Sequence, residues 1–212
     1  MTTRLDLAAA LLDAGAVRLN PKEPFTWASG LKAPIYCDNR QLLGFPDLRA
    51  SVADALAERV AELRPTLVAG TSTAGIAWAT LVADRMGLPL AYVRPEPKKH
   101  GMGRQVEGPR ADGPRIVLVE DLLSTGGSSL RCAEALRAEG GTVLEILALF
   151  SYGLPAAEAA FAEAGLGFHV LATFPELAGR ARAKGMLDAE DAASLDAWQA
   201  DAAAWSRARG GA

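Results

Sequence analysis

Cysteine and histidine are scarce in this chain, and their scarcity limits its chemistry. The sequence has two residues of each type, and the separation of Cys37 and Cys132 matches no metal-binding or redox motif. We therefore expect two unpaired thiols in a reducing compartment, which excludes a disulfide-stapled fold and a cysteine-ligated metal centre.

Long apolar runs and a strong excess of one charge are also missing. No apolar run approaches the roughly 18 residues of a membrane span, and the apolar N-terminal stretch contains Asp6, which fits neither a signal peptide nor an anchor. The formal net charge of −3 gives no electrostatic reason to expect nucleic acid or an anionic membrane as a partner. We expect a soluble, cytoplasmic protein.

Half of the 212 residues are hydrophobic, which is enough for a sizeable core, and the length favours one domain over residues 1–212. Apolar segments predict strands at 66–70, 88–93, 115–119 and 142–150. Amphipathic patterns predict helices between and around them, at 47–63, 72–86, 128–139 and 155–164. This alternation predicts an α/β fold, with a central, mainly parallel twisted sheet flanked by helices.

The segments outside this core of about 47–164 are less regular. We expect a helix at 4–14, one or two short strands within 25–37, and helices at 175–184 and 188–207. Residues 168–174 are compatible with a further strand. Trp78, Trp198, Trp205 and His169 are expected to be structural.

Three predicted strands are followed by loops rich in glycine, hydroxyl or basic side chains, at 70–75, 94–108 and 120–129. Ligands of parallel sheets bind beyond the carboxyl ends of the strands. We therefore expect these three loops to converge on one crevice.

The loop at 120–129 has the composition of a site for a ribose 5-phosphate. Glu120 and Asp121 can accept hydrogen bonds from vicinal hydroxyls, while the glycines and hydroxyl side chains after them can direct N–H and O–H donors at a phosphate beside a helix start. The dinucleotide fingerprint and the phosphate-loop lysine motif are both absent. From this loop alone, a glycine-rich strand-to-helix turn with two solvated acids remains an alternative.

The loop at 94–108 is basic and glycine-rich. Five basic side chains fall within eleven residues of it: Arg94, Lys98, Lys99, His100 and Arg104. This composition fits either a solvated basic loop or a mobile cationic lid over a leaving group such as pyrophosphate. The loop at 70–75 is suited to hold the same pyrophosphate through N–H groups and hydroxyls at another helix start.

These motifs resemble those of a known enzyme family. The segment "VLVEDLLSTGGSS" (117–129) resembles the phosphoribosyl-pyrophosphate signature of type I phosphoribosyltransferases. The pattern formed by Arg94, Lys98, His100 and Gly101 is similar to the catalytic loop of orotate phosphoribosyltransferases, and "FTWASGLKAPIYCDNR" (25–40) resembles their N-terminal, substrate-side segment. The resemblance covers about 25–150.

The resemblance implies transfer of a 5-phosphoribosyl group from phosphoribosyl pyrophosphate to orotate, giving orotidine 5′-monophosphate and pyrophosphate in pyrimidine biosynthesis. Catalytic roles fall on Lys98, His100 and Asp121. Ribose and 5-phosphate fall to Glu120, Asp121, Leu122, Leu123, Ser124, Thr125, Gly126, Gly127 and Ser128. Pyrophosphate would be bound by Arg94, Lys98, His100, Thr71, Ser72, Thr73, Ala74 and Gly75. The orotate pocket would be lined by Lys32, Tyr36 and Cys37.

The resemblance also implies Mg²⁺, held mainly by diphosphate and ribose oxygens of the substrate. It implies a homodimer whose catalytic loop is shared across the interface. It further implies a small hood subdomain from about 1–40, with a C-terminal contribution left open.

The chain departs from the family pattern at three places. Some members have a lysine where this chain has Pro95, a lysine where it has Ala28, and an orotate-binding arginine in the segment that here reads "LFSYGLP" (149–155) and offers Tyr152. Lys32 and backbone N–H groups are therefore our candidates for the orotate carboxylate.

Two alternative functions remain. A phosphoribosyltransferase for a purine or uracil is disfavoured by the N-terminal segment. A non-catalytic, nucleic-acid-binding regulator is disfavoured by the acidic chain and by the basic loop.

Overall fold

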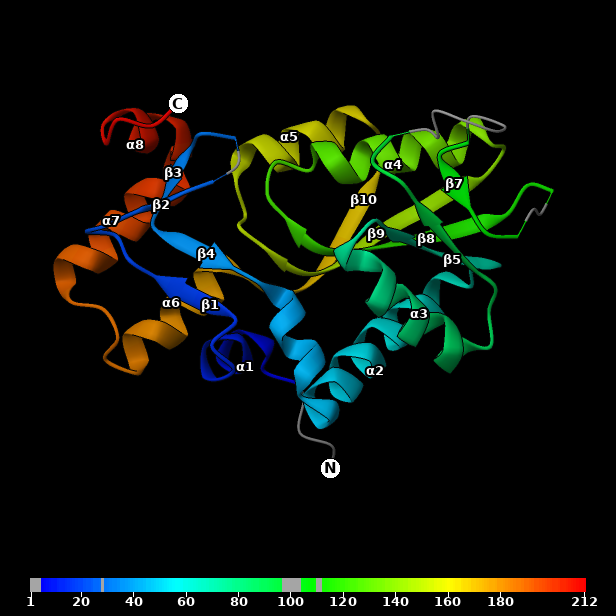
Figure 1. Cartoon of the computed structure of the whole chain (residues 1–212), viewed down its shortest axis with the longest axis horizontal. Helices are drawn as coiled ribbons and strands as arrows, with labels where there is room; N and C mark the ends of the chain where they lie inside the picture. Colours follow the sequence, from blue (N-terminus) through cyan, green and yellow to red (C-terminus); the bar gives the residue numbers. More distant parts are fainter. Residues whose placement is uncertain (1–4, 28, 97–103, 110–111) are drawn as a thin grey trace.

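A six-stranded sheet forms the centre of the computed structural model, which describes residues 5–27, 29–96, 104–109 and 112–212. The strand order is β10-β9-β8-β5-β6-β7 (Figure 1). The strands are β5 (Leu67–Thr71), β6 (Leu90–Val93), β7 (Val106–Glu107), β8 (Arg115–Leu123), β9 (Thr142–Ser151) and β10 (Gly167–Thr173). They pair in parallel except for β7, which runs antiparallel to β6. The predicted α/β class is confirmed.

Helices cover both faces of this sheet because its strands are apolar on both sides. Helices α2 (Pro46–Leu63) and α3 (Ala74–Met86) lie below the sheet in Figure 1, and α4 (Gly127–Ala138) and α5 (Pro155–Glu163) lie above it. Along β8, Val117 and Val119 join the core on the α2–α3 side, whereas Ile116 and Leu118 join the core on the α4–α5 side. Side chains of a strand alternate between faces, so one apolar strand supplies both cores.

The N-terminal segment and the C-terminal helices lie together at the left of Figure 1. Short strands β1 (Val17–Leu19) and β4 (Ile35–Cys37) form one antiparallel pair, and β2 (Phe25–Thr26) and β3 (Lys32–Ala33) form another. Around them lie α1 (Leu7–Asp13), η1 (Asn39–Gly44), α6 (Phe174–Ala183), α7 (Ala189–Ala200) and α8 (Ala202–Arg207). The proposed hood of about 1–40 therefore lies beside the C-terminal helices.

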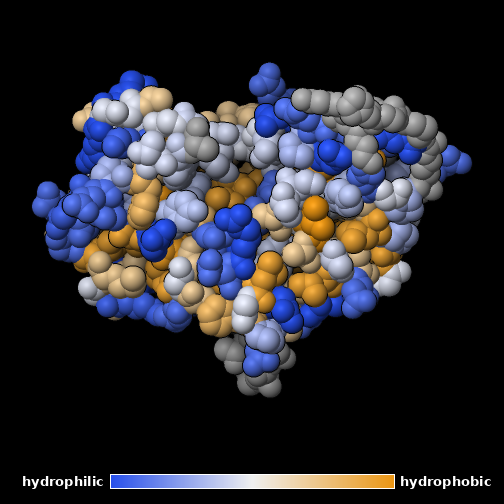
Figure 2. Space-filling view, viewed as in Figure 1, coloured by the Kyte–Doolittle hydropathy of each residue, from blue (hydrophilic) through white to orange (hydrophobic). Residues whose placement is uncertain are grey.

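An aromatic cluster joins these two ends of the chain to the central sheet. The ring of Trp27 stacks on Tyr152 at 4.9 Å between centroids, and Trp198 of α7 meets Tyr152 edge-on at 5.5 Å. The C-terminal helices present a hydrophilic surface at the left edge of Figure 2. Within the described ranges, the helices fall short of the length and hydrophobicity that a membrane crossing requires.

Several expectations differ from the structure, and residues 25–37 form three short strands, β2, β3 and β4, in place of one or two. Strand β8 continues four residues past Val119, because Leu122 and Leu123 pair with Phe150 and Ser151 of the long strand β9. The helical stretch 188–207 is two helices, since Asp201 breaks the first and caps the second by accepting a hydrogen bond from the N–H of Ala204. Strand β1 was not expected at all.

Gly75 lets α3 begin directly against the sheet. A Cβ atom at this position would collide with the carbonyl oxygen of Val119 and would lie 2.5 Å from Thr71 Oγ1. Both neighbours belong to strands, so neither moves freely. Gly75 therefore sets how closely the N-terminus of α3 approaches the ends of β5 and β8.

Gly75→Ala should lower the free energy of unfolding by roughly 1–3 kcal/mol, because the added methyl group overpacks a fixed contact. Thermal unfolding of the variant and the parent protein measures this change. Gly179→Ala in α6 is the matched control, since its Cβ would meet nothing within 4 Å. Because alanine favours helix more than glycine does, Gly179→Ala should be as stable as the parent or slightly more stable. The packing assignment fails if Gly75→Ala behaves in the same way.

Candidate active site

The topology places a crevice between β5 and β8. From β5 the chain winds to β6 and β7 on one side, and from β8 it winds to β9 and β10 on the other. At such a switch point the connections leave in opposite directions, which opens a space at the carboxyl ends of the two strands. Thr71 is the last residue of β5 there, and Glu120 and Asp121 lie in the C-terminal half of β8.

A cavity of about 250 Å³ lies at this place. The described parts of all three sequence-predicted loops line it: Thr71, Ser72, Thr73 and Ala74 from the first, Pro95 and Gln105 from the second, and Glu120, Asp121, Leu122 and Ser128 from the third. Arg131 and Cys132 of α4 complete the lining. The structure thus brings the three loops together at one crevice.

Glu120 is buried and held by donors from three elements. Thr71 Oγ1 donates to Glu120 Oε1 at 2.6 Å, and the N–H of Asp121 donates to the same oxygen at 3.0 Å. Ser129 Oγ of α4 donates to Glu120 Oε2 at 3.0 Å. A carboxylate offers about four acceptor positions, so most of its capacity is satisfied within the protein.

Asp121 has a different environment from its neighbour. Its carboxylate is only half-buried, and burial followed by the charge of Glu120 raises its pKa to about 7. The charge of Arg40 acts in the opposite direction. Asn39 Nδ2 donates to the backbone oxygen of Asp121 at 2.7 Å and fixes the strand at this point. Asp121 is therefore the carboxylate that remains open to a ligand.

The turn after β8 delivers the start of α4 to the crevice. Gly126 adopts a left-handed conformation with φ of 79°, and a Cβ there would lie 2.6 Å from the ring of Phe161. Helix α4 begins at Gly127, and its first N–H groups and positive dipole end face the turn formed by residues 124–127. Ser124 is half-buried, whereas Thr125 and Ser128 are exposed. This geometry suits an anion.

The first loop presents a second helix start. The N–H of Ser72 donates to the carbonyl oxygen of Val93 at 2.9 Å, and α3 begins at Ala74 with Thr73 as its N-terminal cap residue. The Thr73 side chain makes no capping hydrogen bond to this helix start. The N–H groups at the start of α3 therefore keep room for another acceptor.

The second loop is described only at its stem. Arg94 N–H donates to the carbonyl oxygen of Gln105 at 2.9 Å, and Gln105 Nε2 donates to the carbonyl oxygen of Arg94 at 2.8 Å. The Arg94 guanidinium lies 3.6 Å from Glu107, and its side chain is not among those lining the cavity. Lys98 and His100 lie outside the described residues.

Comparison with known proteins identifies the family to which the chain belongs. Residues 39–159 match the model of the phosphoribosyl transferase domain. The chain is 48% identical over 205 residues to the orotate phosphoribosyltransferase of Cutibacterium acnes, covering 96% of this chain and 95% of that protein. It is 47% identical to the Bacillus subtilis enzyme of the same name over 91% of this chain and 90% of that protein. The chain belongs to the orotate phosphoribosyltransferase family.

Solved structures of the family share this fold. The orotate phosphoribosyltransferase of Aeropyrum pernix superposes with a TM-score of 0.74 at 35% identity, covering 86% of this chain and 99% of that chain. The UMP synthase of Leishmania donovani superposes with a TM-score of 0.78 at 28% identity, and the match spans 92% of this chain but 41% of that longer one.

The residues that the family resemblance assigns to orotate lie apart from this cavity. Tyr36 is exposed and lies under the Arg18 guanidinium, 5.3 Å from its ring centroid. The Cys37 thiol donates to Asn39 Oδ1 at 3.2 Å, and burial with the nearby charge of Asp121 raises its pKa. The backbone N–H of Lys32 donates to Ser206 Oγ at 2.8 Å. Cys37 and Asn39 thus connect the N-terminal segment to Asp121.

Sequence reasoning missed four polar residues of the site: Asn39, Arg40, Gln105 and Arg131. Arg131 had a signal of its own, because it follows Ser128 by three positions on a predicted helix and must share its face. The segments 25–40 and 94–108 were identified from the sequence, but the individual roles of Asn39, Arg40 and Gln105 within them were not. Asn39, Arg40 and Gln105 act through contacts between segments distant in the sequence. Such contacts leave no local pattern.

In the described part of the chain, no group of three or more His, Cys, Asp and Glu side chains is placed to hold a metal ion. The carboxylate oxygens that a metal ion could contact at the crevice are those of Asp121 and the remaining acceptor position of Glu120. This small set suits Mg²⁺ that arrives with other oxygen ligands, because Mg²⁺ keeps several waters and substrate oxygens.

In Asp121→Asn, the free energy of unfolding should decrease less with rising pH than it does in the parent protein. The pKa of Asp121 is about 7 when folded against an ordinary value of 3.8, so between these values the folded chain binds the extra proton. The free energy of unfolding therefore decreases as pH rises through this window, and a neutral amide removes that decrease.

Thermal unfolding of the ligand-free protein at about pH 5 and about pH 8 measures this linkage. The variant should gain stability relative to the parent at the higher pH. Asp84→Asn, at an exposed position of α3, is the control and should follow the parent. Parallel curves for Asp121→Asn and the parent would contradict the buried-charge account.

Proposed function

We propose that this chain transfers the 5-phosphoribosyl group of phosphoribosyl pyrophosphate to orotate, releasing pyrophosphate and forming orotidine 5′-monophosphate. The family relatives named above carry this activity in their names. A Mycobacterium tuberculosis orotate phosphoribosyltransferase, 25% identical with a TM-score of 0.64 over 82% of this chain, was solved in complex with 5-phospho-α-D-ribosyl 1-diphosphate.

One observation carries the proposal: the half-buried carboxylate of Asp121 and the N-termini of α3 and α4 lie at a single cavity. The cavity joins Asp121 to Ser128 at the start of α4 and to Ala74 at the start of α3. A ligand with a diol and two separate phosphoryl groups matches this arrangement. Phosphoribosyl pyrophosphate has those three parts.

The donor sugar binds at β8 and the turn that follows. Asp121 accepts hydrogen bonds from the ribose 2- and 3-hydroxyls, and Glu120 contributes its remaining acceptor position. The turn from Ser124 through Thr125, Gly126 and Gly127 to Ser128 binds the 5-phosphate, with Leu122 and Leu123 setting its distance from the acids. N–H groups at a helix start bind such anions well.

The leaving pyrophosphate binds at the first loop, through residues 71–75. Arg94, Lys98 and His100 approach it from the second loop. Because pyrophosphate departs from a carbon with oxocarbenium character, catalysis here is mainly positioning and stabilisation of charge on the leaving group. Lys98 neutralises that charge, and His100 donates a hydrogen bond or a proton to it.

Orotate occupies the side bounded by the N-terminal segment. Tyr36 and Cys37 line this side, and Lys32 with backbone N–H groups is the candidate partner of its carboxylate. The ring nitrogen attacks the anomeric carbon from the face opposite to pyrophosphate, which inverts that centre. The link from Cys37 through Asn39 to Asp121 holds the two substrates' sites in register.

When bound, Mg²⁺ would be held mainly by diphosphate and ribose oxygens of the donor and by water, and it would neutralise charge on the diphosphate. Asp121 and Glu120 act on the same ribose hydroxyls. We further propose that two copies of the chain form a homodimer in which the basic loop serves the neighbouring site.

The loss of orotate absorbance in the presence of phosphoribosyl pyrophosphate and Mg²⁺ tests the proposed reaction. We expect consumption of orotate and stoichiometric release of pyrophosphate. Adenine, hypoxanthine and uracil are tested in parallel. Turnover of one of these bases without turnover of orotate would contradict the substrate assignment.

Lys98→Ala should reduce kcat by roughly 10²- to 10³-fold, the usual effect of removing one group that stabilises transition-state charge. Affinity for the donor should change much less. Steady-state kinetics and donor titration separate the two effects, with Lys22→Ala, a surface lysine paired with Asp188, as the control. An unchanged kcat in Lys98→Ala removes Lys98 from the mechanism.

A further inference from the structure

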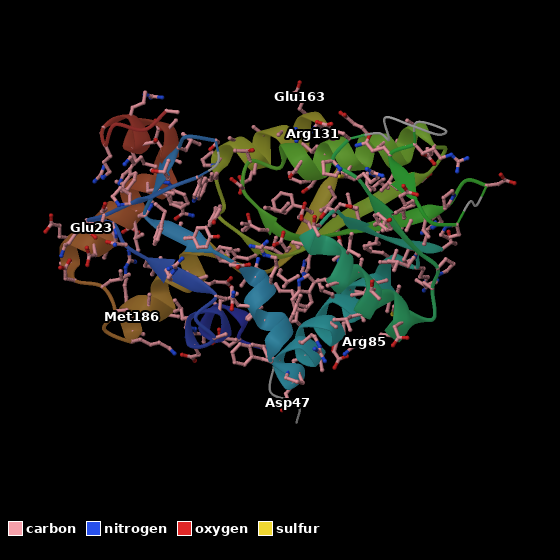
Figure 3. The ribbon with its side chains drawn as sticks, viewed as in Figure 1. Glu23, Asp47, Arg85, Arg131, Glu163 and Met186 are labelled. Atoms are coloured by element: carbon pink, nitrogen blue, oxygen red, sulfur yellow. The ribbon has the colours of Figure 1, made fainter. Side chains whose placement is uncertain are left out.

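Arg131 lies at the edge of the donor cavity without an assigned role. It projects from α4 (Figure 3) and lines the cavity together with Ser128, one helical turn earlier. Its Nη1 atom lies 3.4 Å from the position that a Cβ atom on Gly127 would occupy. The guanidinium is therefore folded back toward the first turn of α4, where the anion-binding turn ends.

Within the described residues, this guanidinium has no ion-pair or hydrogen-bond partner. Several other arginines are paired with carboxylates, as Arg59 is with Glu145 at 2.8 Å and Arg182 with Asp196 at 2.6 Å. The charge of Arg131 acts on the thiol of Cys132, which also lines the cavity.

The negative charges at the cavity favour a binding role for the Arg131 guanidinium. Its protein lining carries two carboxylates, Glu120 and Asp121, and the donor adds a monophosphate and a diphosphate. Helix starts contribute only partial positive charge. A guanidinium presents up to five N–H donors in a planar fork that matches phosphoryl oxygens.

We propose that Arg131 is a further donor-binding residue, whose guanidinium binds a phosphoryl group of phosphoribosyl pyrophosphate across the cavity from residues 72–74. The inference rests on the proposed function. Arg131 acts in binding and leaves the chemistry of the transfer to the other residues. Both phosphoryl groups of the donor are chemically suited, so separate probes are needed for them.

Calorimetric titration of Arg131→Ala and Arg131→Lys tests the proposal, with Mg²⁺–pyrophosphate and ribose 5-phosphate as separate probes and the intact donor as a third. We expect Arg131→Ala to bind the donor about tenfold more weakly, the size of one charge-assisted hydrogen bond. Arg131→Lys should recover part of that loss, since lysine keeps the charge but not the fork. The weakened probe identifies the phosphoryl group.

Arg137→Ala is the matched control, because Arg137 is exposed on the same helix, is absent from the cavity lining and donates to the carbonyl oxygen of Ala164. Both alanine variants should keep the parent's unfolding temperature. Equal donor affinity in Arg131→Ala and Arg137→Ala overturns the inference. Absence of donor binding by the parent protein would instead refute the proposed function.

Discussion

The buried carboxylate of Glu120 is the interaction on which the crevice depends. An ionised carboxylate without donors is costly to bury, by several kcal/mol even after relaxation, so its three hydrogen bonds are structurally required. They come from Thr71 at the end of β5, from the backbone of β8 itself and from Ser129 on α4. One side chain thereby fixes the relative positions of both strand ends and of the anion-binding helix.

That fixed carboxylate also determines the behaviour of its neighbour. Burial and then the negative charge of Glu120 raise the pKa of Asp121, so its proton is held more tightly than usual. A ligand that donates two hydroxyl hydrogen bonds and brings a divalent cation would favour the ionised form. A divalent cation would relieve the repulsion between the two carboxylates, and we propose Arg131 and the two helix starts as the partners of the donor's phosphoryl groups.

Much of this arrangement could be predicted from local sequence pattern. Apolar runs such as 115–119, and the glycines and hydroxyls after them, follow from rules that act within a few residues, and the alternation of strands with helices then requires a parallel sheet. The crevice between β5 and β8 follows from that topology, so the proximity of Thr71 and Glu120 could also be predicted. The family assignment rests on the same motifs and is confirmed by the comparisons.

What sequence could not supply depends on contacts between distant segments. The last residues of β8 read as a loop because two acids interrupt the apolar run, and only the long partner strand β9 keeps them in the sheet. The contacts of Asn39 with Asp121 and of Gln105 with Arg94 join segments with no shared pattern. The break at Asp201 was visible in principle, since aspartate favours helix starts, but the alanine-rich context concealed it.

The most direct test of the central claim is a crystal structure of the protein with bound phosphoribosyl pyrophosphate. The account predicts that the ribose hydroxyls lie within hydrogen-bond distance of Asp121, the 5-phosphate in the turn of residues 124–128, and the diphosphate beside residues 71–75. A donor molecule bound elsewhere, with this crevice still occupied by solvent alone, would contradict it.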